Sequence, residues 1–131
     1  MIDFTKATVL PTSVLAINCT PHVIKFSHEG TEVVVEPCGA TVSAKSIDTP
    51  TGKKGNAVLV KTVFESLPAG LEELETIERE LPDAVIVGSI VSAQTYKGRV
   101  VAMRPAKGFE RVPVAEKRMD CTNFTVFAEE D

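Results

Sequence analysis

Short apolar runs rich in Val, Ile, Thr and Phe recur along the chain and are separated by Gly and Pro. Runs of this kind predict strands joined by turns. The predicted strands cover residues 14–18, 22–27, 32–37, 39–47, 56–64, 84–88, 99–103 and 123–127. The run AVIVG at 84–88 is apolar throughout, so we expect this strand to be buried on both faces.

Three stretches between these runs predict turns or loops. HEGTE, residues 28–32, predicts a tight turn through its glycine. TPTGKKGN, residues 49–56, contains two glycines, a proline and two lysines and predicts a loop. RPAKGFERVP, residues 104–113, predicts a loop or an edge segment. The turn at 28–32 makes its two flanking strands a predicted hairpin.

Two stretches have a helical pattern instead. In LEELETIEREL, apolar residues stand at 71, 74, 77 and 81, most other positions are Glu, and Pro82 follows. This spacing predicts a short amphipathic helix. SIVSAQTYK, residues 89–97, contains neither Gly nor Pro, and Ser89 stands where a helix N-cap would. We therefore predict a compact α+β fold with a mainly antiparallel β-sheet and one or two short helices.

Length and composition bound the class of protein. A chain of 131 residues with 44 % hydrophobic residues suits one domain, residues 1–131, with a packed core. The acidic end at 128–131 is expected to be mobile. No apolar stretch is long enough for a membrane span, and no basic region leads into an apolar signal segment. Three widely spaced cysteines without a CxxC favour a reducing cytoplasm.

Charge is unevenly distributed. The net charge of −4 argues against a long nucleic acid as partner, because phosphate neutralisation needs a basic surface. Residues 97–118 nevertheless contain only two acids, Glu110 and Glu116, beside seven basic residues: Lys97, Arg99, Arg104, Lys107, Arg111, Lys117 and Arg118. A local basic face on an acidic protein suits a small anionic ligand. The alternative is an ordinary solvated face.

The sequence AVIVGSIVSAQ predicts a strand that runs through Gly88 and Ser89 into a helix. A helix N-terminus presents unpaired N–H groups and favours anions. Gly88 would let the backbone approach a phosphate, and Ser89 would donate its hydroxyl. In the alternative, Ser89 only caps the helix. Neither GxxxxGK[ST] nor GxSxG is present, so the stretch is neither a P-loop nor a nucleophile elbow.

The pentapeptide NCTPH groups several reactive side chains between two predicted strands. Asn18, Thr20 and His22 could hydrogen-bond a base or ribose, and His22 could act as a general acid–base. In the alternative, His22 bonds the backbone at a strand start. A turn at 20–21 would be needed for Cys19 and His22 to form a thiolate pair. The two histidines lack the spacing of a zinc site, so no metal is expected.

A third group comes from YKGRVVAMRPAKGFER. Tyr96 offers a ring for stacking, while Arg99, Arg104 and Arg111 offer planar cationic groups that bind phosphate bidentately. Lys107 adds charge in a flexible turn. Together with Ser89, these residues predict a phosphate-binding site.

Several of these stretches together resemble a family of small, mostly uncharacterised bacteriophage and bacterial proteins that share an N-x-T-P-H motif. The similarity covers about two-thirds of the chain in patches, at residues 18–22, 67–68, 84–94, 98–99 and 104–105. Residues 71–81 and the segment from 118 onward depart from the pattern. The resemblance implies a phage context in a bacterial host cytoplasm, where some small phage proteins sequester nucleotide signals of host defence.

The leading functional hypothesis is a non-enzymatic homo-oligomer that binds a small phosphate-bearing ligand such as a nucleotide or cyclic nucleotide. It involves no cofactor, metal, membrane or long nucleic acid. A small chain can form a pocket between subunits more easily than within one. One alternative is an enzyme that cleaves a phosphoester or glycosidic bond with His22. Another is a protein-interaction module, an inhibitor or a phage structural part.

Overall fold

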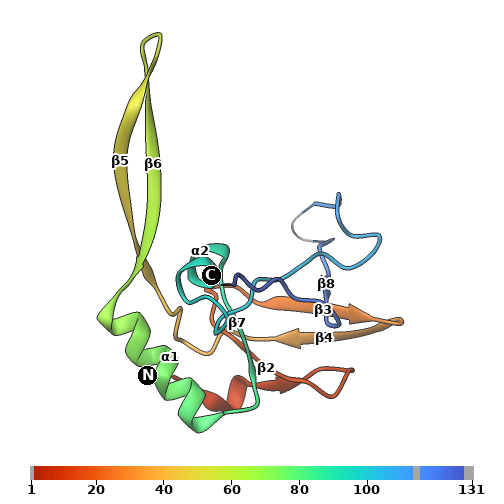
Figure 1. The fold of residues 1–131 in the computed structure, drawn as a ribbon. Coiled ribbons are helices and arrows are strands. Elements are labelled where there is room, and N and C mark those ends of the chain that lie inside the picture. The colour runs from red at the N-terminus through yellow and green to blue at the C-terminus, as the bar shows by residue number, and fades with distance from the viewer. Residues whose placement is uncertain (1, 114–115, 129–131) are drawn as a thin grey trace.

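Three small sheets and two α-helices form the described part of the chain, in a computed structural model that describes residues 2–113 and 116–128. The strand orders are β1-β2-β7, β4-β3-β8 and β5-β6. The strands are β1 Thr8–Val9, β2 Leu15–Asn18, β3 Ile24–His28, β4 Thr31–Val35, β5 Ala44–Lys54, β6 Ala57–Ser66, β7 Val85–Val87 and β8 Met119–Asp120. The helices are η1 Phe4–Lys6, α1 Pro68–Glu80 and α2 Ile90–Thr95 (Figure 1).

Most of the strand pairs are antiparallel, which confirms the predicted α+β class with a mainly antiparallel sheet. The pairs β1·β2, β3·β4 and β5·β6 are antiparallel, whereas β2·β7 and β3·β8 are parallel. A parallel pair needs a long connection between its strands. The chain between β2 and β7 contains β3 to β6 and α1, so this requirement is met.

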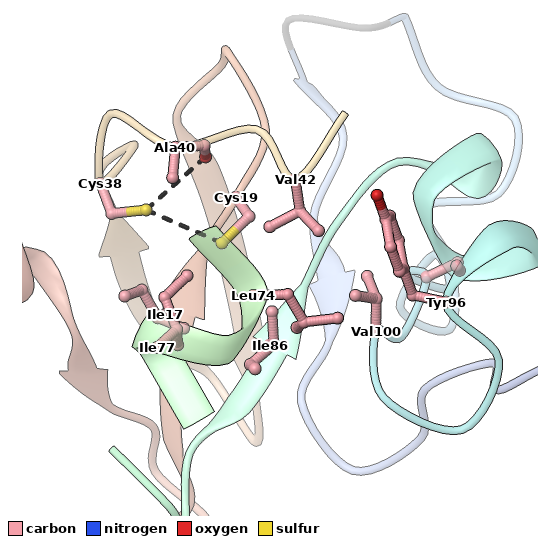
Figure 2. Packing of buried hydrophobic residues seen from close by; sticks show 12 residues of the cluster. Ile17, Cys19, Cys38, Ala40, Val42, Leu74, Ile77, Ile86, Tyr96 and Val100 are labelled. Atoms are coloured by element: carbon pink, nitrogen blue, oxygen red, sulfur yellow. Dashed lines mark hydrogen bonds between the residues drawn. The ribbon is translucent and has the colours of Figure 1, made fainter. Parts of the chain in front are cut away.

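The sheet of β1, β2 and β7 separates two apolar clusters. Ile17 and Ile86 are register partners in β2 and β7, and both pack in a cluster with Leu74 and Ile77 of α1 (Figure 2). The neighbouring Val87 belongs to the second cluster, which the other three-stranded sheet covers. Because successive side chains of a strand point to opposite faces, β7 is buried on both sides. The predicted burial of residues 84–88 is thereby confirmed.

The β5–β6 hairpin, called the arm here (residues 44–66), extends away from the rest of the molecule (Figure 1). The predicted loop at 49–56 is wrong, because β5 continues to Lys54 and only residues 55 and 56 form the turn. Gly55 has φ +61°, a conformation suited to a tight hairpin turn. A register shift between Pro50 and Gly52 accommodates the proline, which cannot donate to the ladder.

Three other predicted strands are shorter or more irregular than expected. Residues 39–43 precede β5 as irregular chain, in which Gly39 and Val42 have positive φ angles that a strand does not adopt. Residues 99–103 and 123–127 form only isolated bridges, one of them between Ala102 and Thr125.

Both predicted helices are present. α1 begins at Pro68, three residues before the predicted start, because proline is well suited to the first helical position. α2 follows Ser89, which caps it as predicted. No helix among residues 2–113 and 116–128 is long and apolar enough to cross a membrane. Of the acidic end at 128–131, residues 129–131 lie outside the described residues.

Candidate functional site

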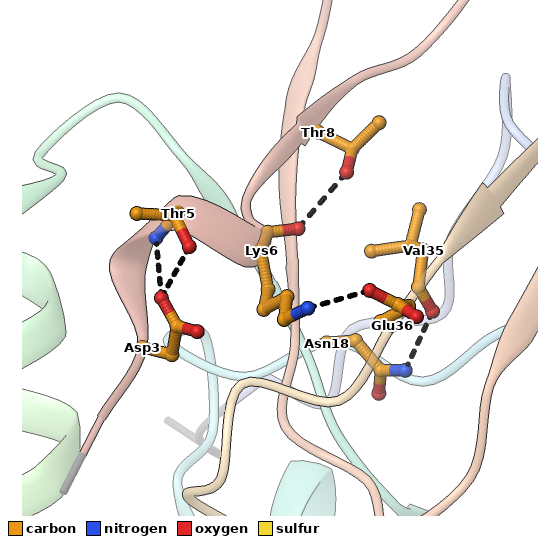
Figure 3. A network of polar contacts seen from close by, with 7 residues as sticks. All are labelled: Asp3, Thr5, Lys6, Thr8, Asn18, Val35 and Glu36. Carbon is orange, nitrogen blue, oxygen red and sulfur yellow. Dashed lines mark hydrogen bonds and ion pairs between the residues drawn. The ribbon is translucent and has the colours of Figure 1, made fainter.

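Asn18 organises the NCTPH turn from a fully buried position. Its amide nitrogen donates to the carbonyl oxygens of His22 at 2.7 Å and Val35 at 3.0 Å. Its amide oxygen accepts from the backbone nitrogen of Thr20 at 2.9 Å and from the Thr20 hydroxyl at 2.6 Å. Figure 3 shows the contact with Val35. Both ends of the amide are therefore bonded within the protein, so in this conformation Asn18 holds the turn and presents no free group to a ligand.

Gly88 and Ser89 also have structural partners. The Ser89 hydroxyl accepts from the backbone nitrogen of Ser92 at 3.1 Å, which is the N-cap bond of α2. A Cβ atom at Gly88 would lie 2.6 Å from Cγ1 of Val100, so the glycine is needed for close packing. Gly88 and Ser89 therefore have structural roles at the connection between β7 and α2. Of the two, only Ser89 is exposed and can also contact a ligand.

Tyr96 is buried and lies at the base of the arm. Its hydroxyl donates to the carbonyl oxygen of Ser43 at 2.9 Å and accepts from the backbone nitrogen of Leu67 at 3.3 Å. These two residues flank the arm on either side, before β5 and after β6. Tyr96 therefore joins the two ends of the arm, and its ring is not exposed for stacking on a base in this conformation.

Three of the predicted cationic residues lie in two places. Arg99 pairs bidentately with Glu78 of α1, at 2.6 and 3.1 Å, and the hydrogen bonds to Glu78 raise the pKa of Arg99. Arg104 donates to the hydroxyl of Thr125 at 3.3 Å. Arg104 and Lys107 share a cavity, described below, that Arg99 does not line. The structure thus separates Arg99 from the other two.

One cavity brings together predicted residues from separate segments. This cavity, called the His22 cavity, has a volume of about 490 Å³. It is lined by Thr20, Pro21, His22, Val23, Ile24, Lys25, Ser89, Met103, Lys117 and Met119. The NCTPH turn therefore lies beside Ser89, as a shared site requires. Arg99 does not line this cavity.

Three residues that line the His22 cavity were not predicted as binding residues: Lys25, Met103 and Met119. The alternation of apolar and polar residues in HVIKFS indicates that Lys25 faces away from the core, because its neighbours Ile24 and Phe26 are both buried. Lys117 was noted only as part of the basic stretch. Its ammonium group donates to the carbonyl oxygen of Glu110 at 3.0 Å, and Glu110 does not line the His22 cavity.

A second cavity, called the Arg104 cavity, has a volume of about 550 Å³. It is lined by Arg104, Pro105, Lys107, Glu110, Asp120, Asn123 and Phe124. Burial opposes the charge on Asp120, but hydrogen bonds from Thr122 and Asn123 hold the pKa of Asp120 below its usual value. The Arg104 cavity therefore contains two carboxylates beside its two cations, which makes it less favourable to an anion than the His22 cavity.

Cys19 and His22 do not form a catalytic pair. Cys19 points into the core, where its sulfur lies 3.7 Å from that of Cys38 (Figure 2), whereas His22 is exposed. The hydrogen bond with Cys38 and burial both raise the pKa of the Cys19 thiol. The thiol is therefore protonated and inaccessible near neutral pH, so it cannot serve as a nucleophile.

Burial of all three cysteines gives a direct test of this arrangement. The native protein is expected to react only slowly with Ellman's reagent, because burial shields all three thiols. Burial also raises the pKa of Cys121, whereas the hydrogen bond with Cys19 lowers the pKa of Cys38 to about 7, so Cys38 is protected by shielding alone. Unfolding in guanidinium chloride should release three reactive thiols per chain, which serves as the internal control. Rapid reaction of a full equivalent of thiol in the native state would contradict the burial of these side chains.

Within residues 2–113 and 116–128, no three His, Cys, Asp or Glu side chains are grouped so as to hold a metal ion. Comparisons of the chain with protein-family models, with curated proteins and with solved structures gave no match. The class of protein is therefore described by its own fold and cavities. It is a compact α+β domain with an arm, and a partly apolar cavity with lysines in its lining lies beside the NCTPH turn.

Proposed function

We propose that the protein binds, without turnover, a small anionic molecule that also carries an apolar or aromatic part, such as a nucleotide or cyclic nucleotide. The observation that carries this proposal is the His22 cavity, where Thr20, His22 and Ser89 meet from two distant segments. Its volume falls within the range of about 300–1,000 Å³ that is typical of small-molecule sites.

The lining of the cavity suits both parts of such a ligand. Val23, Met103 and Met119 form apolar walls against which a base can lie, and methionine adapts to irregular shapes. Lys25 and Lys117 supply positive charge for a phosphate. In the part of the chain that the structure describes, no carboxylate lines this cavity, so nothing there opposes an anion.

The arrangement of His22 favours binding over catalysis. A general acid–base needs a partner that fixes its tautomer and direction. The imidazole of His22 makes no hydrogen bond with residues 2–113 or 116–128. Its neighbours Asn18 and Cys19 are buried in structural contacts. His22 is therefore better suited to donate a hydrogen bond to a ligand than to drive a reaction.

The resemblance to small phage proteins extends the proposal to a biological role. A protein that holds a cyclic nucleotide without cleaving it can lower the free concentration of a host defence signal. This role would place the protein in the cytoplasm of a bacterial host. It rests on the resemblance of short motifs in the sequence alone, and the titration with cyclic di-AMP below tests its ligand.

Calorimetric titration with AMP, ADP, 3′,5′-cyclic AMP and cyclic di-AMP tests binding. We expect at least one probe to bind, and Lys25→Gln with Lys117→Gln to weaken it about tenfold or more, since both remove charge-assisted contacts. Arg99→Gln is the matched control, because Arg99 lines neither cavity and should leave affinity unchanged. Binding lost instead in Arg104→Gln with Lys107→Gln would place the site in the Arg104 cavity.

Chromatography of the bound probe separates binding from catalysis. We expect the probe to be recovered unchanged after prolonged incubation with the protein. A product that accumulates with wild-type protein and disappears with His22→Ala would establish the enzymatic alternative. If none of the probes binds, the proposal of a nucleotide-like ligand is wrong.

A further inference from the structure

The arm exposes apolar side chains on both of its faces. Ile47 is opposite Val63 in the β5–β6 register, and Pro50 is opposite Val60. Directly opposed residues share a face, so one face carries Ile47, Leu59 and Val63 while the other carries Pro50 and Val60. The exposed fraction is 46 % for Leu59 and 52 % for Val60. The base of the arm lies against α2, whereas both faces of its outer part are exposed.

An isolated two-stranded hairpin is only marginally stable in water, and clustered exposed apolar residues usually mark a contact surface. The base of the arm is nevertheless fixed, because Tyr96 bonds Ser43 and Leu67 on either side of it. The arm is therefore attached to the body at one end and is open to a partner along most of its length (Figure 1).

The charge of the arm differs in sign from that of the rest of the chain. Residues 44–66 contain four lysines and two acidic residues, so the remaining residues contain ten basic and sixteen acidic ones. The acid is concentrated on α1, which has five glutamates and one arginine. A basic arm on an acidic body is complementary to the body of another copy.

The surface of α1 offers a suitable place for the arm. A shallow hollow of about 390 Å³ runs along it, lined by Pro68, Leu71, Glu72, Glu75, Thr76 and Arg79. Partly exposed Leu71 supplies an apolar contact beside two glutamates. One face of the arm presents the matching order of apolar, basic and apolar side chains at Leu59, Lys61 and Val63.

We propose that the arm of one copy docks along α1 of a second copy. The arm cannot reach its own α1, because only Leu67 lies between β6 and the helix and the arm points away from it (Figure 1). Reciprocal docking gives each copy one arm contact and one helix contact, which closes a two-fold dimer. Such a dimer buries the apolar residues of the Leu59 and Val63 face of each arm.

Sedimentation velocity of the full chain tests this interface. We expect a dimer, and Leu59→Ser with Val63→Ser should raise its dissociation constant about tenfold or more by removing apolar contacts. Both side chains are exposed in one copy, so circular dichroism should show an unchanged fold. Lys107→Glu, a charge reversal on the body, is the control and should not affect assembly.

A charge-swap experiment identifies a second copy as the partner. Lys54→Glu with Lys61→Glu on the arm, and separately Glu72→Lys with Glu75→Lys on α1, should each produce monomers through like-charge contacts, since Lys54 is opposite Ala57 and so shares a face with Lys61. An equimolar mixture of the two variants should form heterodimers, because each arm then meets a helix of opposite charge. A monomeric wild type, a dimer unchanged by the arm substitutions, or a mixture that stays monomeric would each overturn the proposal.

Discussion

Replacing Gly70 by alanine is expected to lower the free energy of unfolding by about 2 kcal/mol or more, although alanine is the better helix former. A Cβ atom at this position would lie 2.1 Å from the carbonyl oxygen of Ser43 and 2.7 Å from the Tyr96 hydroxyl. The Ser43 oxygen is backbone and accepts the Tyr96 hydrogen bond, so it cannot move without disturbing the base of the arm. The clash therefore outweighs the gain in helix propensity.

Urea denaturation of Gly70→Ala beside Ala69→Gly measures this effect. Ala69 is the exposed neighbour in the same turn, so its replacement should cost only the propensity difference of about 1 kcal/mol. The two substitutions thus isolate packing from propensity. If Gly70→Ala were as stable as the wild type, the close approach of α1 to Ser43 would be wrong.

The second large effect is expected at Asn18. Changing Asn18 to Asp keeps the shape of the side chain but replaces its two N–H donors by a carboxylate oxygen. The carbonyl oxygens of His22 and Val35 would then face a buried negative charge. Because an unpaired buried polar group costs about 1–3 kcal/mol, and more when charged, we expect a loss of about 3 kcal/mol or more.

The same substitution at an exposed position is the control. Asn56→Asp in the turn of the arm introduces the same charge in solvent and should change stability by about 0.5 kcal/mol or less. Urea denaturation compares the two variants, and thermal denaturation provides a check. An Asn18→Asp variant with wild-type stability would show that the amide does not hold the NCTPH turn through these hydrogen bonds.

The elements that sequence reasoning found correctly are those with a strong local pattern. The strand at 84–88 is a continuous apolar run, and α1 has apolar residues at helical spacing. The Ser89 cap follows from the preference of serine for that position. Such signals depend only on neighbours in the sequence, so no knowledge of the tertiary fold is needed to find them.

The arm was missed for a physical reason. Residues 49–56 have the composition of a loop, yet residues 49–54 pair with β6, whose Val58–Val60 run is strong strand material. Pairing with a good strand overrides the weak preference of Gly, Pro and Lys. The opposite error occurs at 99–103 and 123–127, where strand-like composition leads only to isolated bridges, because composition alone does not supply a partner strand along the whole segment.

The candidate site was predicted only in part. Thr20, His22 and Ser89 line one cavity, whereas Tyr96 and Asn18 are buried and Arg99 pairs with Glu78. The sequence shows that a side chain is polar, but burial depends on how distant segments pack. Strand alternation could have placed Lys25 on the side away from the core. That Lys25 and Lys117 line one cavity depends on the parallel pairing of β3 and β8, which the sequence does not show.

That pairing also determines when during folding the His22 cavity can form. Phe26 and Met119 are register partners from nearly opposite ends of the chain, whereas the arm closes between neighbouring residues. Local contacts form early, and the entropy of closing a long loop delays distant ones. During synthesis, the arm can form while β8 is still inside the ribosome. The wall of the cavity at Met119 is therefore among the last parts of the molecule to form.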